Sequence, residues 1–413
     1  MTKQHVNETR IQEMIEGIAQ FTSTPGKGTT RLTYSEEHRG VRDYLLTKMK
    51  EAGLQTREDA VGNLFGRIEG QNPDLPPVLV GSHFDSVPNG GAFDGPAGVV
   101  TGLETAFVFQ ELGLKPERPV EIIAMIEEEG GRFGSGLLGS RLLTGQVSQQ
   151  DLQELKDANG VSVAEAMSTF GLDPSHADKV ALAADSIHAF LELHIEQGPV
   201  LEQHEEDVGI VTEVVSLSQV EVTVKGAAGH AGTTPMNARK DAMVGAASII
   251  AKLPEMVKAV DDAAVGTVGR ITAQPGGANV IADSVSFSVD IRSPSANSVA
   301  QIKERLNTAL EQLQPSGLTY NVSEKITIPS TPMSADIQKQ FAHDADSFGL
   351  KWRHMPSGAG HDAMILSKIT QVGLVFVPSR DGISHAPEEW TDYDKLAKGI
   401  EVIFRTAKAL SES

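Results

Sequence analysis

The pattern of apolar and polar positions predicts alternating helices and strands in the first half of the chain. A helix is expected over 35–53, because apolar residues recur there at four-residue spacing between a serine cap and a closing glycine. Apolar strands are expected at 78–80 and 122–126, with a helix over about 99–112 between them. The stretch 148–187 has the pattern of helices and loops. Alternation of this kind predicts an α/β fold with a mostly parallel sheet.

A second pattern begins near residue 210 and indicates an inserted domain. Apolar and polar residues alternate there with the period of half-exposed strands, and amphipathic helices separate the strands. The expected order is βαββαβ, the ferredoxin-like arrangement. After Pro329 the first pattern resumes, so we expect one domain from 1–210 and 330–413, and another from 211–329. The expected elements of the insertion are strands at 220–225, 264–273, 285–291 and 318–322, and helices at 241–260 and 299–310.

Composition narrows the classes of function. A chain of 413 residues is long enough for two domains. Its net charge of −20 argues against a nucleic-acid partner, because phosphate binding needs a basic surface. There is no cysteine, so any metal must be held by histidine and carboxylate. No apolar run is long enough to cross a membrane and no secretory signal is evident, so a cytoplasmic location is expected.

Metal-capable side chains follow four of the expected strands. His83 and Asp85 follow the first, three consecutive glutamates at 127–129 follow the second, and His194 and His385 accompany two later ones. Each alone is more often structural, since a single histidine or a run of glutamates is common without a ligand. Together they indicate a shared site, because the carboxyl ends of parallel strands meet at one edge. Three carboxylates leaving a buried strand also require a nearby cation.

Several motifs in this order resemble a known family. The sequences HFDSVPNGGAFDG, EEGGRF, ELHIEQGPVLE, GHAGTTPM, SGAGHDA and DGISHAPEEW are similar to those of di-metal amidohydrolases that cleave ureido compounds. That family includes N-carbamoyl-L-amino-acid hydrolases, allantoate amidohydrolases and β-ureidopropionases, and is related to aminoacylases and di-zinc aminopeptidases. The resemblance covers essentially the whole chain. It implies a catalytic di-metal domain and an inserted lid that also forms a dimer.

The resemblance also implies a ligand set for two divalent ions per subunit, Zn²⁺ or else Mn²⁺, Co²⁺ or Ni²⁺. Asp94 is expected to bridge the ions, Glu128 to be the general base, and Asp85 to orient the His83 imidazole. Whether His83 and His194 bind the same ion stays open. The Asp94–Gly95 peptide bond is expected to be cis. The implied metal ligands are His83, Asp94, Glu129, His194 and His385.

The substrate side follows from the same resemblance. His230 is expected to polarise the scissile carbonyl, and in a homodimer to do so in the partner subunit's site. Arg292 is the natural clamp for a substrate carboxylate, because a guanidinium can bind it through two hydrogen bonds. The other implied substrate contacts are Gln197, Asn279, Gly358, Gly360 and His361.

The expected reaction is hydrolysis of a ureido C–N bond with release of ammonia and CO₂. The triple glutamate and SGAGHDA are more similar to allantoate enzymes, whereas HFDSVPNGGAFDGPAGV and GTVGRITAQPGGANVI are more similar to enzymes for N-carbamoyl-L-amino acids. An aminopeptidase or N-acyl-amino-acid deacylase is the alternative within the same chemistry. A catalytically silent binding protein is the alternative of another class, and it would be expected to have a broken ligand set.

Overall fold

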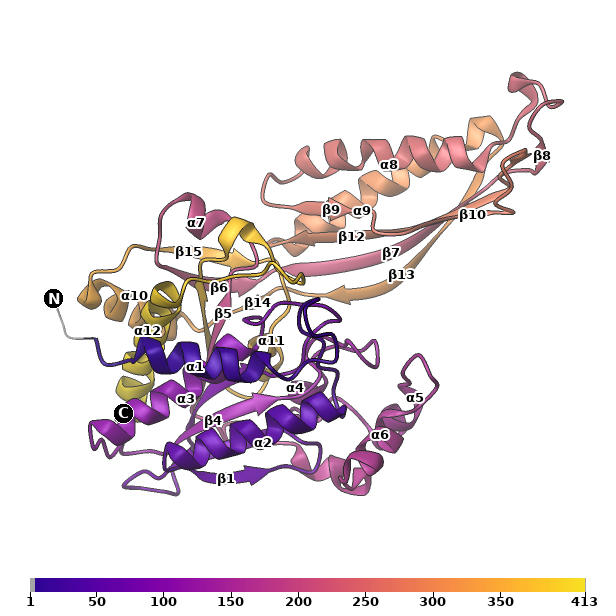
Figure 1. Ribbon diagram of the computed structural model, residues 1–413. Coiled ribbons are helices and arrows are strands. Elements are labelled where there is room, and N and C mark those ends of the chain that lie inside the picture. Colours follow the sequence, from indigo (N-terminus) through magenta and orange to yellow (C-terminus); the bar gives the residue numbers. More distant parts are fainter. Residues whose placement is uncertain (1–3, 413) are drawn as a thin grey trace. The chain divides into compact units, whose positions relative to one another are not determined.

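The computed structural model describes residues 4–412 and divides them into two compact units (Figure 1). The first unit contains the chain up to Thr212, then 333–355, and the chain from Gly360 onward. The second contains 213–332 and the short segment 356–359. The predicted inserted domain, 211–329, falls almost entirely within the second unit. Among the described residues, no helix is both long and apolar enough to span a membrane.

A nine-stranded sheet with the order β1-β2-β4-β3-β5-β16-β6-β14 forms the core of the first unit, and β15 pairs with β6. The four central strands, β4, β3, β5 and β16, are parallel, whereas β1, β2, β6 and β14 pair antiparallel. Strands β3, β4 and β5 are buried at every position, as expected for parallel strands covered on both faces. The strands are β1 Gln55–Glu58, β2 Leu64–Ile68, β3 Val78–His83, β4 Val120–Met125, β5 Ala189–Ile195, β6 Val208–Val214, β14 Thr331–Pro332, β15 Trp352–Ser357 and β16 Gln371–Val377.

Helices α3 and α12 pack against each other and against the central strands. Ser35 caps α2 by accepting a hydrogen bond from the N–H of His38, as the sequence predicts. Helix α3 begins with Pro96, a residue suited to a first helical turn. The helices of this unit are α1 Glu8–Ala19, α2 Glu36–Glu51, α3 Pro96–Glu111, α4 Leu138–Leu143, α5 Gln149–Glu154, α6 Val163–Phe170, α7 Val200–Gln203, α10 Ala335–Phe348, α11 Asp362–Leu366 and α12 Tyr393–Ser411, with 3₁₀ turns η1 Pro174–Val180 and η4 Arg380–Gly382.

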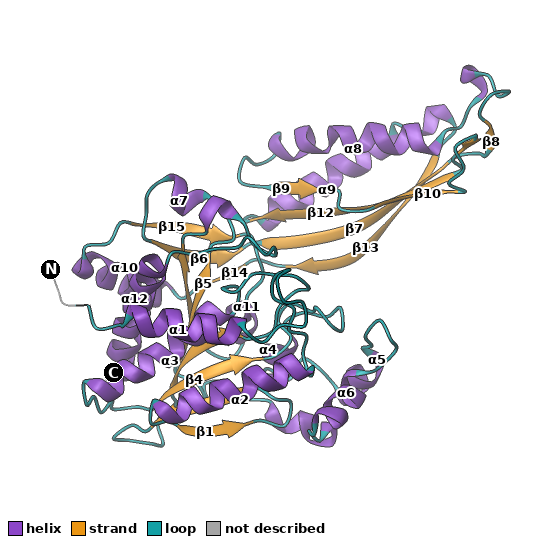
Figure 2. Ribbon diagram, viewed as in Figure 1, coloured by secondary structure: helices purple, strands orange, loops and turns teal. Residues whose placement is uncertain are grey.

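The second unit is an antiparallel sheet with the order β10-β12-β7-β13, and two helices cover one face (Figure 2). This is the ferredoxin-like order, and apolar residues of β7 and β12 alternate toward α8 and α9 to form the core. The expected strand at 264–273 is divided into β9 and β10, which both pair with β12. The elements are β7 Ser216–Lys225, β8 Gly229–His230, η2 Met236–Ala238, α8 Ala242–Lys258, β9 Val265–Thr267, β10 Ile271–Gln274, β11 Val280–Ile281, β12 Ser284–Ser293, α9 Ala296–Glu311, η3 Gln314–Ser316 and β13 Thr319–Ile328.

Candidate active site

Asp94 lies at the centre of a cluster of three imidazoles. Its Oδ1 atom is 3.4 Å from Nε2 of His83 and 3.1 Å from Nε2 of His194. Its Oδ2 atom is 3.3 Å from Nε2 of His385, and that nitrogen is 3.4 Å from Oε2 of Glu129. Burial opposes the charge of Asp94, but His194 and the other imidazoles hold its pKa well below the usual value. The two oxygens of one carboxylate therefore face two different groups of side chains.

Two sets of three side chains could each hold a metal ion, and the sets share Asp94. Within each set the ligand atoms lie within 4.8 Å of one another. His83 and His194, whose pairing the sequence left open, face the same oxygen of Asp94 and fall in the same set. A further combination, of His83 with Glu128 and Glu129, overlaps both sets. The two sets are His83, Asp94 and His194, and Asp94, Glu129 and His385.

The chemistry of this cluster fits divalent cations. Both ring nitrogens of His83 and the Oε1 atom of Glu129 are buried without a hydrogen-bond partner. Burial, followed by the charge of Asp94, raises the pKa of Glu129 to about 7. Burial also raises the pKa of Glu128 well above its usual value, against the influence of His83. A cation in the cluster would offset the free-energy cost of burying these charged carboxylates. Imidazole together with carboxylate is a donor set for Zn²⁺, Mn²⁺, Co²⁺ or Ni²⁺.

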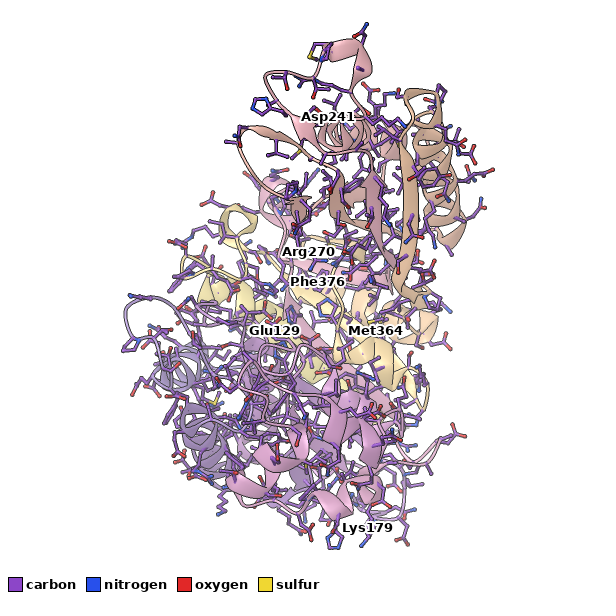
Figure 3. All side chains as sticks on the ribbon, turned by 90° about the vertical axis from the view of Figure 1, so that its right-hand side faces the viewer. Glu129, Lys179, Asp241, Arg270, Met364 and Phe376 are labelled. Carbon is purple, nitrogen blue, oxygen red and sulfur yellow. The ribbon has the colours of Figure 1, made fainter. Side chains whose placement is uncertain are left out.

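Asp85 links the His83 strand to the glutamate loop that follows β4, where Figure 3 labels Glu129. Its Oδ1 atom lies 3.5 Å from Nδ1 of His83 and accepts a hydrogen bond of 3.0 Å from the N–H of Glu128. Its Oδ2 atom accepts one of 3.3 Å from the N–H of Glu129. Asp85 therefore lies where a group orienting His83 would lie. It also holds the glutamate loop, a contact that the sequence did not predict.

Glu127, to which the sequence assigned no role, shapes the same loop from within. Its backbone has a φ of 50° and its side chain is fully buried. The Oε1 atom accepts hydrogen bonds from the N–H groups of Arg132 and Phe133. The loop thus turns sharply after β4, so that the three consecutive glutamates have different environments.

Gln197 and His361 lie beside the cluster. The Nε2 atom of Gln197 donates a hydrogen bond of 2.6 Å to Oδ2 of Asp94, so this expected substrate contact touches the central carboxylate. The His361 side chain is 1% exposed, and its ring packs edge-on against that of His194 at 4.6 Å between centroids. Burial and His194 hold the pKa of His361 well below the usual value. His361 is therefore a buried ring packed against a candidate ligand, whereas the resemblance implied that it contacts substrate.

The turn between Asp94 and α3 differs from the expectation of a cis bond. The Asp94–Gly95 bond is trans, and among the described residues the only cis peptide bond is Gln274–Pro275. Gly95 makes the turn instead through a φ of 82°, which glycine adopts without strain. A Cβ atom there would lie 2.4 Å from the ring of His83. Glycine is therefore required at this position both by the backbone conformation and by the neighbouring imidazole.

All but one of the remaining expected substrate residues belong to the second unit. His230 is exposed and lies in β8, which pairs with β11 next to Asn279. Arg292 lies in β12, where its Nε atom donates to Oδ1 of Asp290 at 2.9 Å and its Nη1 atom donates to the carbonyl of Gly358 at 2.7 Å. Gly358 belongs to the second unit and Gly360 to the first.

Arg292 and the chain segment that leads to His230 lie at opposite ends of the second unit's larger sheet, and His230 itself lies in the separate pair of strands β8 and β11. Arg292 pairs with Leu217 near the start of β7, and Ser284 pairs with Lys225 at its end. His230 follows Lys225 in the chain. The eight-residue offset along β12 corresponds to roughly 25 Å. The structure therefore does not bring these two expected substrate contacts of one chain together within the second unit.

Three buried carboxylates near the cluster were not predicted. Glu192 accepts hydrogen bonds from Oγ of Ser82 at 2.7 Å and from the N–H of Ala363 at 3.0 Å. Burial, followed by Glu192, raises the pKa of Asp362 to about 7. The position of Glu192, two residues before His194 on one strand, was a usable signal because such residues share a face. Glu389 contacts the Asp94 segment, but nothing in the sequence distinguishes it from the neighbouring Glu388.

Comparison with known proteins identifies relatives along the whole chain. The family model for peptidase family M20/M25/M40 matches residues 79–409. The N-carbamoyl-L-amino-acid amidohydrolase of Paenarthrobacter aurescens is 45% identical over 99% of this chain and 100% of its own. The allantoate amidohydrolase of Bacillus subtilis is 36% identical over 98% of each.

Solved structures give the same result. The crystal structure of an amidase of the hydantoinase/carbamoylase family from Burkholderia multivorans matches with a TM-score of 0.92 and 31% identity, and the match covers 99% of this chain and 98% of that one. The fold, the shared carboxylate and the sequence matches agree. The chain therefore belongs to peptidase family M20/M25/M40.

Proposed function

We propose that the chain hydrolyses a ureido C–N bond, with N-carbamoyl-L-amino acids as the preferred substrates. The observation that carries the proposal is the pair of overlapping three-ligand sets that share Asp94, with Glu128 beside them. Relatives that bear the name N-carbamoyl-L-amino-acid amidohydrolase are 39–45% identical, against 33–36% for allantoate amidohydrolases. These values favour carbamoyl amino acids over allantoate. The products would be the amino acid, ammonia and CO₂.

In this proposal the chain holds two divalent ions. His83, Asp94 and His194 would hold one, and Asp94, Glu129 and His385 the other. Bound ions of this kind polarise a carbonyl and acidify water. Asp85 supports the arrangement from behind, because it lies beside the His83 ring and fixes the backbone of the glutamate loop.

Glu128 is the group proposed to move the proton. It is not needed in either set around Asp94, and its Oε2 atom lies 3.8 Å from Nε2 of His83. A carboxyl whose pKa is raised by burial can accept a proton from water and return it to the leaving nitrogen near neutral pH. The ureido C–N bond then breaks as the nitrogen of the amino acid receives that proton.

The second unit supplies several of the proposed substrate contacts. Arg292 is held by Asp290 and the Gly358 carbonyl, so its guanidinium is fixed in orientation before substrate arrives. A fixed guanidinium is suited to the α-carboxylate of a carbamoyl amino acid. His230 is proposed to donate a hydrogen bond to the scissile carbonyl as negative charge develops there. Asn279 is proposed to bind substrate close to His230.

A homodimer is part of the proposal. A carbamoyl amino acid is much shorter than the roughly 25 Å along β12 that separate Arg292 from the end of the sheet where the chain leads to His230, so one chain cannot apply both to one substrate. Two copies could, with His230 of one acting in the site of the other. Six large apolar side chains of the second unit are also exposed, and we propose that a partner covers some of them. The six are Met236, Met243, Val244, Val265, Ile271 and Val280.

The experiment is a parallel assay of ammonia release from N-carbamoyl-L-amino acids, allantoate and N-carbamoyl-β-alanine, after loading with Zn²⁺, Mn²⁺ or Co²⁺. We expect the first class to react fastest and metal analysis to approach two ions per chain. Faster release from allantoate would assign that substrate instead. Release of amino acids from dipeptides, with no ammonia from any ureido compound, would contradict the proposal.

A further inference from the structure

The side chain of Glu389 joins two segments that lie far apart in the sequence. It is 4% exposed and follows His385 by four residues, at the start of the approach to α12. Its Oε1 atom accepts hydrogen bonds of 3.0 Å from the N–H groups of both Phe93 and Asp94. Its Oε2 atom accepts one of 2.8 Å from Oγ of Ser384. One carboxylate therefore fastens the backbone of the shared acid and the residue that precedes a candidate histidine ligand.

The surroundings of Glu389 are built for this close approach. A Cβ atom on Gly91 would lie 2.1 Å from Oε1 of Glu389, so only glycine leaves room for the carboxylate there. His385 has a φ of 56°, an unusual conformation for a residue other than glycine. The contact from Glu389 to the adjacent Ser384 helps to hold that conformation. The carboxylate thus lies at a point where both segments turn sharply.

Ser384 makes a second contact that gives the arrangement a chemical consequence. Its Oγ atom is 3.0 Å from Oδ2 of Asp94 as well as 2.8 Å from Oε2 of Glu389. A hydroxyl has one proton and can donate it to only one of these oxygens at a time. When Ser384 donates its hydrogen bond to Glu389, it does not donate to Asp94. The lone pairs of Asp94 Oδ2 that face Ser384 are then free of this hydrogen bond. Gln197 still donates to the same oxygen.

We propose that Glu389 is a positioning residue that fixes Asp94 relative to His385 and draws the Ser384 proton away from the shared carboxylate. The inference rests on the proposed metal site and names a group that acts on it from behind. Glu389 itself is not a ligand, because its oxygens are directed to two N–H groups and a hydroxyl. Removing the Glu389 carboxylate is expected to weaken binding of the ion that Asp94, Glu129 and His385 would hold.

The test uses the full-length chain and measures the affinity for Zn²⁺ by competition with a chromophoric chelator, without substrate. E389A removes the tether and is expected to weaken binding of one ion about 10- to 100-fold, the usual effect of losing a partner behind a ligand. E388A is the matched control, because Glu388 is the exposed neighbour. It is expected to bind both ions as the unchanged chain does.

E389Q separates positioning from simple packing. The amide oxygen can still accept from the two N–H groups, but its NH₂ group then faces Ser384 and donates to it. Ser384 must therefore donate its hydrogen bond to Asp94, where this bond competes with the ion for the carboxylate oxygen. We expect E389Q to keep the unfolding temperature of the metal-free chain and to bind one ion more weakly. The double variant S384A/E389Q is expected to recover most of the lost affinity, because the competing proton is gone.

The outcomes separate this inference from the proposed function. If the unchanged chain binds no Zn²⁺, the metal site itself is wrong. If it binds two ions and E389A and E389Q bind both with unchanged affinity, Glu389 has no positioning role. If E389Q loses affinity and S384A does not restore it, the claim about the Ser384 proton is wrong. An E389A chain that does not fold leaves the decision to E389Q and the double variant.

Discussion

The candidate metal cluster of the first unit and the proposed substrate residues of the second are built in opposite ways. His83, Asp94 and His194 are at most 6% exposed and come from the ends of parallel strands or the turns that follow them. Backbone groups and buried carboxylates hold the cluster on several sides. His230, in contrast, is exposed, and its Nδ1 atom accepts only a local hydrogen bond from the N–H of Gly232.

This difference indicates a division of labour. A site for metal ions must be rigid, because ligand distances determine affinity, and burial in a sheet edge provides that rigidity. A group that contacts substrate must let the substrate bind and leave, and an exposed position such as that of His230 permits both. The variants below test whether loss of a buried group affects chemistry while loss of an exposed one affects binding or assembly.

The largest effect is expected from E128Q. Glutamine keeps the shape of the side chain but cannot accept the proton of water, so kcat should fall by about 10³- to 10⁴-fold. Metal content should stay at the level of the unchanged chain, because Glu128 lies outside the two sets around Asp94. Ammonia release and metal analysis on the same preparation check both statements. Substantial remaining turnover would show that another group moves the proton.

H230A is expected to lower kcat about 10²- to 10³-fold, as loss of a donor to a developing oxyanion usually does. It also tests the proposed assembly. If His230 acts in the partner's site, a mixture of H230A and E128Q chains re-forms one complete site in each mixed dimer. Random mixing should then restore about one quarter of the original activity. No recovery after verified subunit exchange would place His230 in its own chain's site.

R292A is expected to reduce kcat/KM about 10- to 100-fold, mainly through KM, since it removes a charge-assisted contact to the substrate carboxylate. Arg270 provides a matched control. It is also in the second unit (Figure 3), and its side chain is 67% exposed against 33% for Arg292. Steady-state kinetics of R292A and R270A on the same substrate make the comparison. Equal effects of the two variants would indicate general attraction by positive charge.

The last prediction concerns stability instead of activity, and it tests a single buried histidine. The His38 ring stacks on Phe84 at 4.5 Å, and burial, aided by the charge of Arg31, lowers its pKa from 6.5 to about 3. At pH values between these two pKa values, His38 is protonated in the unfolded chain and neutral in the folded chain. The free energy of unfolding should therefore fall as pH decreases from 6.5 toward 3, by about 1.4 kcal/mol per pH unit from this group.

The His38→Gln variant should lack that contribution, because its amide does not titrate in this range. Urea unfolding of both proteins at several pH values gives the difference directly and removes the contributions of other groups. The two curves should converge as pH falls. Curves that stay parallel would show that His38 is protonated in the folded chain.

Local rules in the sequence predicted much of the fold. The spacing of apolar residues identified α2, α3, β3, β4 and the elements of the ferredoxin-like unit, because burial on one face imposes that spacing. The short strands β1 and β2 were not predicted, and neither was the division of one expected strand into β9 and β10. Strands of three to five residues carry too few apolar positions to give a clear period.

The sequence by itself determined which side chains were available for the site: no cysteine, and histidines and carboxylates at strand ends in a recognisable order. Only the tertiary structure decided how they combine. It directs His83 and His194 to one oxygen of Asp94, places Glu389 against the Asp94 backbone, and puts Arg292 at one end of β12 and the chain that leads to His230 at the other. These are relations between residues remote in the chain, and they depend on strand order and register, which no local pattern encodes.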